Sequence, residues 1–307
     1  MKRIKIVSVG GARPNFVKIA ALARAFEQYE QVDFQIIHTG QHYDTALDGV
    51  IFEQLQIPAP KYHLGVGSDT PNRQMAQMLS GLEPAYLELS PDLVIVVGDT
   101  TSTLAAALAA VKMNIPVAHV EAGLRSGDRT MPEEINRILA DTLSDFLFVT
   151  EQSGVDHLLY QGITTDKIFL VGNCMIDTLI RCRKKASETQ SLKRFGLLPE
   201  NYALATFHRP SNVDAKSDLE VLIRLLAAAG LAMPVVLPLH PRMRDCLERF
   251  GLTAKLASLE NIHVIDPLGY LEFLDLMAHA AIVITDSGGI QEETTFLGVP
   301  CLTLRST

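Results

Sequence analysis

The stretch PDLVIVVGDTTSTLAAAL, Pro91 to Leu108, decides the fold class of this 307-residue chain. It begins with a short run of apolar, mostly β-branched residues, passes through Gly98-Asp99-Thr100, and continues into an alanine-rich segment. A continuous apolar run of this length is typical of a strand buried on both faces, as in parallel sheets. The stretch therefore predicts a parallel strand, a polar turn and a following helix.

The same pattern recurs along the chain, because short apolar runs alternate with longer amphipathic ones. Such alternation forms parallel sheets covered by helices on both faces. The predicted strands are Ile4–Val9, Phe34–His38, Leu93–Val97, Pro116–Val120, Phe146–Thr150, Ile168–Val171, Ala203–Phe207, Val235–Leu239, Ile262–Ile265, Ala281–Thr285 and Pro300–Leu304. We therefore predict an α/β fold with two Rossmann-like, doubly wound parallel-sheet domains.

The polar, basic segment RCRKKASETQSLKRFG, Arg181–Gly196, interrupts the alternation. It is a candidate connection between the domains, or in part a surface helix. We predict an N-terminal domain over residues 1–177 and a C-terminal domain over residues 178–307. A ligand is expected in the cleft between them.

Composition and charge argue against some classes of binding partner. A net charge of −8 argues against non-specific binding to nucleic acid or to an acidic membrane surface. The four cysteines lie far apart, with no CxxC pair, which predicts a reduced cytoplasmic protein without a zinc site. The most apolar window, Val221–Leu239, contains an arginine, a glycine and two prolines. It therefore predicts a helix, a turn and a strand, and no membrane span.

Many predicted strands run directly into a polar residue or a glycine. These strand ends are Gly10, Gly98-Asp99, Glu121, His208, His240 and Asp286. Ligands of open α/β sheets bind outside the carboxyl ends of the strands. We therefore expect the functional residues at these positions.

Two strand–helix turns in the first domain carry charged residues. After the first strand, Pro14 can begin a helix, and Arg13 and Lys18 lie near that helix start, where anions are favoured. These cations either contact a phosphate or sugar, or are solvated charges on a turn. Asp99 follows the strand of the opening stretch, where it either caps the next helix or belongs to a site.

The stretch VEAGLRSGDRTMPEEINR, Val120–Arg137, concentrates opposed charges. Thr130 and Glu133 have the spacing of a capping box, and Glu133 and Arg137 share a helix face on which they could simply pair. These structural roles do not account for Glu121, because a carboxylate at the end of a buried strand is costly unless it is paired or used. Two carboxylates from different elements could serve as proton donor and acceptor.

The second domain carries the clearest anion signal, in TDSGGIQEETTF. Ser287-Gly288-Gly289 predict a tight turn before a helix, where backbone N–H groups would face a phosphate. Glu292 and Glu293, both expected in the first helical turn, suit the helix dipole, and one of them could accept hydrogen bonds from a ribose diol. The strand ends at His208 and His240 add imidazoles, although a lone histidine is more often structural than catalytic.

Taken together, these motifs resemble those of the non-hydrolysing UDP-N-acetylglucosamine 2-epimerases. The resemblance runs in register from Gly10 to Arg305, and the matching motifs are GARPNFVK, TGQHYD, VGDTTSTLAAAL, HVEAGLRSGDRTMPEEINR, VGNCMIDTL, HRPSNVD, PLGYLEFLDLM and TDSGGIQEETTFLGVPCLTLR. The hydrolysing relatives resemble this chain less, since they lack the Pro-Glu-Glu-x-Asn-Arg run.

This resemblance implies a GT-B fold, a UDP-sugar bound between two Rossmann-like domains, the second of which binds UDP, and a homodimer. The catalytic candidates that it implies are Lys18, Asp99, Glu121, Glu133 and His208. The implied substrate- or UDP-binding residues are Arg13, Arg137, Phe273, Ser287, Gly288, Gly289, Glu293 and Arg305. Gln41 and His42 match a motif linked to a regulatory UDP-N-acetylglucosamine site in bacterial members.

The activity implied is reversible inversion of carbon 2, which supplies cell-surface polysaccharide synthesis. UDP leaves, a carboxylate removes the carbon 2 proton to give 2-acetamidoglucal, and UDP returns with a proton delivered to the opposite face. This scheme needs neither NAD nor a metal.

Three other functions stay open. Family members continue for some tens of residues beyond the position of Thr307, so a UDP-binding, inactive truncated homologue is one alternative. A UDP-sugar glycosyltransferase of the same fold is another, and the acid-rich Val120–Arg137 stretch speaks against it. Relatives with the same motifs act on UDP-2,3-diacetamido sugars, which is the third.

Overall fold

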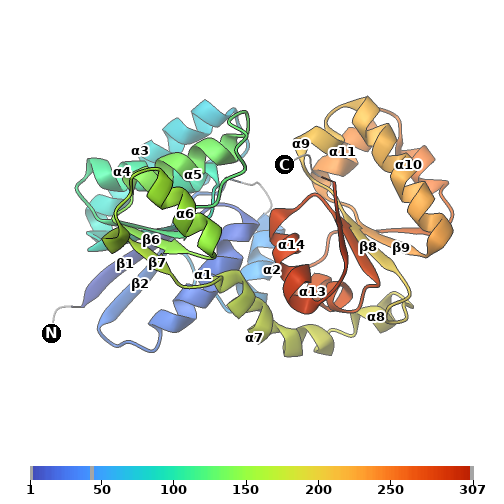
Figure 1. Ribbon diagram of the computed structural model, residues 1–307, viewed down its shortest axis with the longest axis horizontal. Coiled ribbons are helices and arrows are strands. Elements are labelled where there is room, and N and C mark those ends of the chain that lie inside the picture. Colours follow the sequence, from blue (N-terminus) through green and yellow to red (C-terminus); the bar gives the residue numbers. More distant parts are fainter. Residues whose placement is uncertain (1–2, 42–44, 305–307) are drawn as a thin grey trace. The chain divides into compact units, whose positions relative to one another are not determined.

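The computed structural model describes residues 3–41 and 45–304, which form two compact units. Residues up to Thr178 belong to unit 1, and residues from Leu179 onward belong to unit 2. The division falls inside helix α7 (Cys174–Glu188). Each unit contains one parallel sheet with helices packed on it (Figure 1).

Unit 1 is built on a seven-stranded sheet with the order β3-β2-β1-β4-β5-β6-β7, in which all the pairings are parallel. The strands are β1 (Ile4–Gly10), β2 (Val32–His38), β3 (Tyr62–His63), β4 (Leu93–Val97), β5 (Val117–Ala122), β6 (Phe146–Val149) and β7 (Ile168–Leu170). The helices are α1 (Arg13–Phe26), α2 (Thr45–Leu55), α3 (Pro71–Leu89), α4 (Thr101–Lys112), α5 (Pro132–Leu143), α6 (Gln152–Tyr160) and the 3-10 turn Thr165–Lys167.

Unit 2 is built on a five-stranded parallel sheet with the order β10-β9-β8-β11-β12. Its strands are β8 (Ala203–Thr206), β9 (Val235–Pro238), β10 (Ile262–Ile265), β11 (Ile282–Thr285) and β12 (Cys301–Thr303). The helices that follow α7 are α8 (Ser191–Arg194), α9 (Pro210–Val213), α10 (Lys216–Ala232), α11 (Pro241–Arg249), α12 (Thr253–Ala257), α13 (Tyr270–Ala278) and α14 (Gly288–Leu297).

The predicted fold class, with two Rossmann-like units of the GT-B type, is confirmed for each unit by its strand order. Every predicted strand is present to within one or two residues at each end. The sequence missed only β3, which has two residues and therefore no readable periodicity. The apolar window Val221–Leu239 forms the end of α10 and then β9, and no helix of the described residues is long and apolar enough to cross a membrane.

Of the two alternatives for Arg181–Gly196, the helical one is confirmed, and the segment does not lie at the division between the units. The segment forms the second half of α7 and then α8, and it lies in unit 2, after the division at Thr178. Leu179, Cys182 and Ala186 follow helical spacing and are buried, so they place this half of α7 in the packing of unit 2. In the sequence, the charged residues between these three positions obscure their helical spacing.

Strand order also fixes where a site can form. The order reverses between β1 and β4 in unit 1, and between β8 and β11 in unit 2. The segments that leave neighbouring strands on opposite faces open a crevice at such a switch point. In unit 1 this is where Arg13 and Asp99 follow their strands, and in unit 2 it is where His208 and Asp286 do.

Candidate active site

Glu121 and Lys18 form a buried ion pair at the carboxyl end of the unit 1 sheet. The Lys18 Nζ contacts Glu121 Oε2, and only 8% and 12% of the two side chains are exposed. Burial by itself lowers the pKa of Lys18, but Glu121 and Asp99 outweigh it and the net shift is upward. Lys18 is therefore a cation at neutral pH, held between two carboxylates.

The backbone at Glu121 is unusual for a strand. Its φ is +74°, a region that L side chains rarely adopt, and the register with β6 shifts between Val120 and Ala122. Conformations of this kind cost free energy and gather at functional sites. The bulge turns this carboxylate out of the regular alternation of β5.

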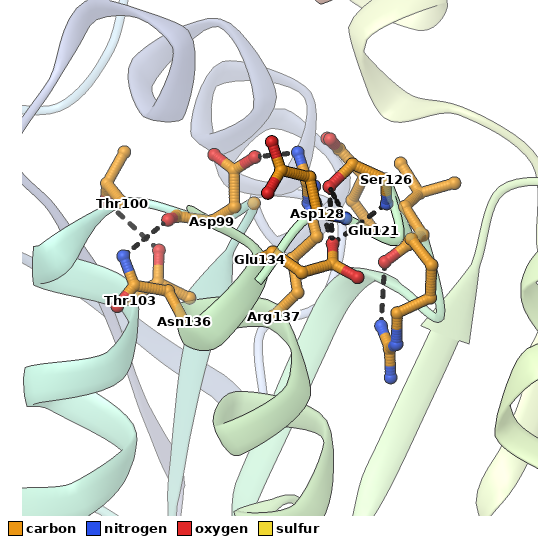
Figure 2. Close-up of polar contacts among 12 residues, drawn as sticks. Asp99, Thr100, Thr103, Glu121, Ser126, Asp128, Glu134, Asn136 and Arg137 are labelled. Atoms are coloured by element: carbon orange, nitrogen blue, oxygen red, sulfur yellow. Dashed lines mark hydrogen bonds and ion pairs between the residues drawn. The ribbon is translucent and has the colours of Figure 1, made fainter. Parts of the chain in front are cut away.

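Asp99 is held by Arg137 on the neighbouring helix (Figure 2). Arg137 Nη2 lies 2.5 Å from Asp99 Oδ2, and its Nη1 lies 3.2 Å from Glu134 Oε2. The backbone oxygen of Asp99 accepts a hydrogen bond from Asn136 at 2.9 Å. The N-cap of α4 is Thr100, so Asp99 is not the helix cap that the sequence left open.

The predicted capping box at Thr130 does not form. Helix α5 has Met131 as its N-cap, one residue later than the box requires, so Glu134 occupies its third position in place of Glu133. The Thr130 hydroxyl and amide donate to Asp128 instead, at 2.6 and 2.9 Å. The simple pairing of Glu133 with Arg137 is also wrong, because Arg137 is engaged by Asp99 and Glu134.

Glu134, which the sequence did not single out, anchors the loop before α5 (Figure 2). Its carboxylate accepts from the backbone N–H groups of Ser126 and Gly127 at 2.9 and 3.1 Å. Burial raises the pKa of Glu134, but these donors and Arg137 outweigh it and bring the pKa below its ordinary value. Glu134 lies three residues before Arg137, a spacing at which two side chains can pair on a helix. That spacing could have identified Glu134 from the sequence.

A second buried charge cluster lies behind this site. His119 Nδ1 is 2.7 Å from Asp141 Oδ1, and its Nε2 is 2.8 Å from the carbonyl oxygen of Gly98. Both partners are acceptors, so both ring nitrogens carry hydrogen; burial lowers the pKa of His119, but Asp141 and Gly98 more than offset it. Asp141 also pairs with Arg125 at 2.7 Å. This cluster ties β5 and α5 to the turn that carries Asp99.

The remaining candidates of unit 1 lie at the same strand ends. Arg13 opens α1 and is half-buried, and Gln41 Oε1 accepts from the Ser102 hydroxyl at 2.8 Å. Glu133 is half-buried, and no hydrogen bond or ion pair joins it to another described residue. His42 and Arg305, also predicted, lie outside the described residues.

In unit 2, Asp286 binds the segment that begins at His208. Its carboxylate accepts from the backbone N–H of Arg209 at 2.9 Å and lies 2.9 Å from His208 Nδ1. His240 is the N-cap of α11, and its ring centre lies 5.6 Å from that of His208. The sequence noted Asp286 only as a strand end and missed this contact.

Helix α14 begins directly at the glycine pair. Ser287 is its N-cap and Gly288 its first residue, so Gly288 and Gly289 form the first helical turn and not a separate tight turn. The N–H groups of this turn have no partner inside the helix and can bind an anion. Phe273, in α13, is half-buried.

Glu293 lies in the second turn of α14, so its expected place in the first turn is wrong. It is 5% exposed, and Tyr270 donates its hydroxyl hydrogen to Glu293 Oε1 at 2.8 Å. Burial raises the pKa of Glu293 to about 7, although the Tyr270 hydrogen bond opposes this shift. Across the described residues no group of three His, Cys, Asp or Glu side chains is arranged to hold a metal ion.

Comparison with known proteins gives the family. A model described as UDP-N-acetylglucosamine 2-epimerase matches residues 24–307. The UDP-N-acetylglucosamine 2-epimerase of Methanocaldococcus jannaschii is 43% identical over 98% of this chain and 84% of its own length. The UDP-2,3-diacetamido-2,3-dideoxy-D-glucuronate 2-epimerase of Pseudomonas aeruginosa is 41% identical over 98% of this chain and 83% of its own length.

A solved structure agrees with these sequence matches. The crystal structure of the Methanocaldococcus jannaschii enzyme in complex with UDP-GlcNAc and UDP matches with a TM-score of 0.93 and 43% identity, over 99% of this chain and 84% of that one. Sequence motifs, the topology of each unit and these relatives all agree. The chain therefore belongs to the UDP-N-acetylglucosamine 2-epimerase family.

Proposed function

We propose that this chain is an isomerase that interconverts UDP-N-acetylglucosamine and UDP-N-acetylmannosamine by inverting carbon 2. The observation that carries the proposal is the set of partly buried acids and bases at the carboxyl ends of β4 and β5. There Lys18 pairs with Glu121, and Arg137 pairs with Asp99. Each pair places a carboxylate, a side chain that can accept a proton, beside a cation.

Unit 1 would carry the proton transfers. The bond from carbon 1 to the UDP oxygen breaks, positive charge develops on the ring, and the carbon 2 proton becomes acidic enough for a carboxylate to remove. Glu121, Asp99 and Glu133 are the candidate acids and bases, with Lys18 and Arg13 as cations toward the departing diphosphate. Return of UDP and delivery of a proton to the other face of carbon 2 complete the inversion.

Unit 2 would hold UDP. The first-turn N–H groups of α14, from Ser287 to Gly289, suit a diphosphate, and the buried Glu293 suits the ribose diol. We assign Phe273 to the uridine, Arg305 to the diphosphate, and His208 to proton transfer or hydrogen bonding at the leaving oxygen. Most residues assigned to UDP therefore lie in unit 2 and most assigned to proton transfer lie in unit 1, so substitutions can distinguish loss of binding from loss of chemistry.

A UDP-2,3-diacetamido uronic acid is the second candidate substrate. The Pseudomonas aeruginosa relative named for it is nearly as similar as the Methanocaldococcus jannaschii enzyme, at 41% against 43% identity. Both reactions invert the same carbon beside an acetamido group. The assigned proton-transfer residues serve either one, and the substituents at carbons 3 and 6 decide between them.

The test is a panel of substrates with the products separated by chromatography. We expect UDP-N-acetylglucosamine to give UDP-N-acetylmannosamine, and the reverse reaction to proceed from the product. Conversion of the diacetamido uronic acid alone would select the second candidate. Binding of UDP without conversion of either sugar would contradict the proposal and favour an inactive homologue, and sugar transfer to an acceptor would favour a glycosyltransferase.

We further propose a cytoplasmic homodimer that serves cell-surface polysaccharide synthesis, with domain limits at residues 1–177 and 178–307. Gln41 and His42 are proposed to belong to a regulatory site for the substrate. Light scattering after gel filtration tests the dimer. Sigmoidal dependence of turnover on UDP-N-acetylglucosamine, lost in Gln41→Ala, tests the regulatory site.

A further inference from the structure

Asp286 is a fully buried carboxylate directly after β11, and four donors converge on it. Oδ2 accepts from the backbone N–H groups of His208 and Arg209 at 3.1 and 2.9 Å and from Asn212 Nδ2 at 3.0 Å. Oδ1 lies 2.9 Å from His208 Nδ1. The two oxygens therefore differ, because Oδ2 accepts the three shorter bonds from the loop, while Oδ1 faces the imidazole ring and receives only a longer bond, 3.2 Å, from the His208 N–H.

The protonation of this carboxylate decides which imidazole nitrogen carries hydrogen. Burial raises the pKa of Asp286, but His208, Asn212 and Arg209 outweigh it and bring the pKa to about 2. At neutral pH the group is ionised and can only accept hydrogen bonds. His208 Nδ1 must then be the donor, so the lone pair of a neutral ring lies on Nε2.

The other side of the ring is open. The side chain of His208 is 41% exposed, and no described residue is hydrogen-bonded to its Nε2. The ring lies beside β8 at the switch point of the unit 2 sheet, where Ser287 begins α14 after the neighbouring strand β11. Nε2 is thus the nitrogen available to a ligand at this edge.

We propose that Asp286 is a positioning residue that fixes His208 in the Nδ1–H form, so that Nε2 is the atom His208 offers to the substrate. The proposal rests on the proposed function for the role of His208, but the tautomer itself does not depend on it. Nε2 would accept a proton or, once protonated, donate a hydrogen bond to the diphosphate leaving group. A carboxylate that orients a histidine in this way also stabilises the imidazolium that forms.

The competing explanation is that Asp286 only fastens the loop. Asp286→Asn separates the two, because its amide oxygen can keep the contacts of Oδ2 while its NH₂ group takes the place of Oδ1. That NH₂ group would donate to His208 Nδ1 and shift the hydrogen to Nε2. Asn212→Ala is the matched control, since it removes one contact to the same carboxylate and leaves the imidazole contact in place.

The direct test is two-bond ¹H–¹⁵N NMR of the histidine rings in the ligand-free protein at alkaline pH, where imidazole rings are neutral. We expect the Nδ1–H form in the wild type and in Asn212→Ala, and the Nε2–H form in Asp286→Asn. An Nε2–H form in the wild type would overturn the proposal, whether or not the variant folds and whether or not the chain has epimerase activity.

A double-mutant cycle tests the functional part. If Asp286 acts through His208, Asp286→Asn should lower kcat roughly a hundredfold in the wild type and by less than about threefold in His208→Gln. Equal losses in the two backgrounds would show that Asp286 acts independently of the imidazole and would contradict the proposed role. If the wild type converted no UDP-sugar, the proposed function would fail, while the NMR result would still decide the tautomer.

Discussion

At the scale of single residues, the site depends on charges that the fold makes costly. Lys18 and Glu121 are nearly buried, and a buried charge is costly unless it is paired as these two are. The sequence indicated Glu121 because a carboxylate follows an apolar strand. It did not indicate the partner, because Lys18 lies on a different element more than a hundred residues earlier. Strand-end positions can be predicted from pattern, whereas the pairs across elements need the folded chain.

Glu121 and Glu133 are expected to differ in what their loss does. Glu121→Gln removes the carboxylate that is in direct contact with Lys18, so it should cost roughly 3 kcal/mol of stability and also slow turnover about a hundredfold. Glu133→Gln breaks no contact between described residues, so it should slow turnover similarly while stability stays nearly unchanged. Thermal unfolding and initial rates on the two variants measure both effects. Wild-type turnover in Glu133→Gln would remove Glu133 from the mechanism.

Glu293 is expected to make UDP binding depend on pH. Its pKa is about 7 in the folded chain against an ordinary value of 4.5, so the folded state retains a proton that the unfolded state releases. Stability contributed at this position is therefore lost as pH rises from about 4.5 to 7, and is constant above that. A ribose diol donates best to the ionised form, so UDP affinity should rise up to about tenfold from pH 6 to pH 8.

Calorimetric titration at several pH values checks this, with Glu293→Gln as the control that retains the titration of UDP itself. The increase in UDP affinity with pH should be smaller in Glu293→Gln, because only the titration of UDP itself remains there. The same pH dependence in both proteins would mean that Glu293 does not govern it.

At the scale of elements, the helix starts show which structural features could be predicted from the sequence and which could not. A phosphate site was predicted because a strand, Ser287 and two glycines lead directly into a helix, whose first N–H groups have no partner inside the helix, and it stays a prediction. The start of α5 was misplaced by one residue, since Thr130 matches a capping box but the chain uses Met131. Because of this shift by one residue, Glu134 and not Glu133 binds the backbone of the loop before α5. The capping-box motif could not show that the Thr130 hydroxyl would donate its hydrogen bond to Asp128 instead.

The start of α14 gives a test of diphosphate binding. Gly288→Val adds a branched side chain at the first helical residue, beside the N–H groups assigned to the diphosphate. UDP affinity should fall at least about tenfold, through lost close approach to the backbone. Uridine, which lacks the diphosphate, should bind equally to both proteins. Unchanged UDP affinity would place the diphosphate elsewhere.

At the scale of the whole molecule, the strand order of the five-stranded sheet recurs within the seven-stranded one, and each unit has candidate residues at its switch point. Strand–helix alternation predicted both sheets because each strand is a separate local pattern. Contacts such as Arg137 with Asp99, or His208 with Asp286, join segments that only the strand order brings together. The sequence therefore predicted the strand ends at which the candidate residues lie better than the contacts that those residues make.

Inversion of carbon 2 by removal of its proton would exchange that proton with solvent, which proton NMR of UDP-N-acetylglucosamine in deuterated water detects. We predict that the carbon 2 proton signal disappears from the substrate and that the UDP-N-acetylmannosamine formed carries deuterium at that carbon. Formation of UDP-N-acetylmannosamine that retains the original proton, or an unchanged substrate spectrum with active-site titration showing bound UDP-sugar, would contradict the account.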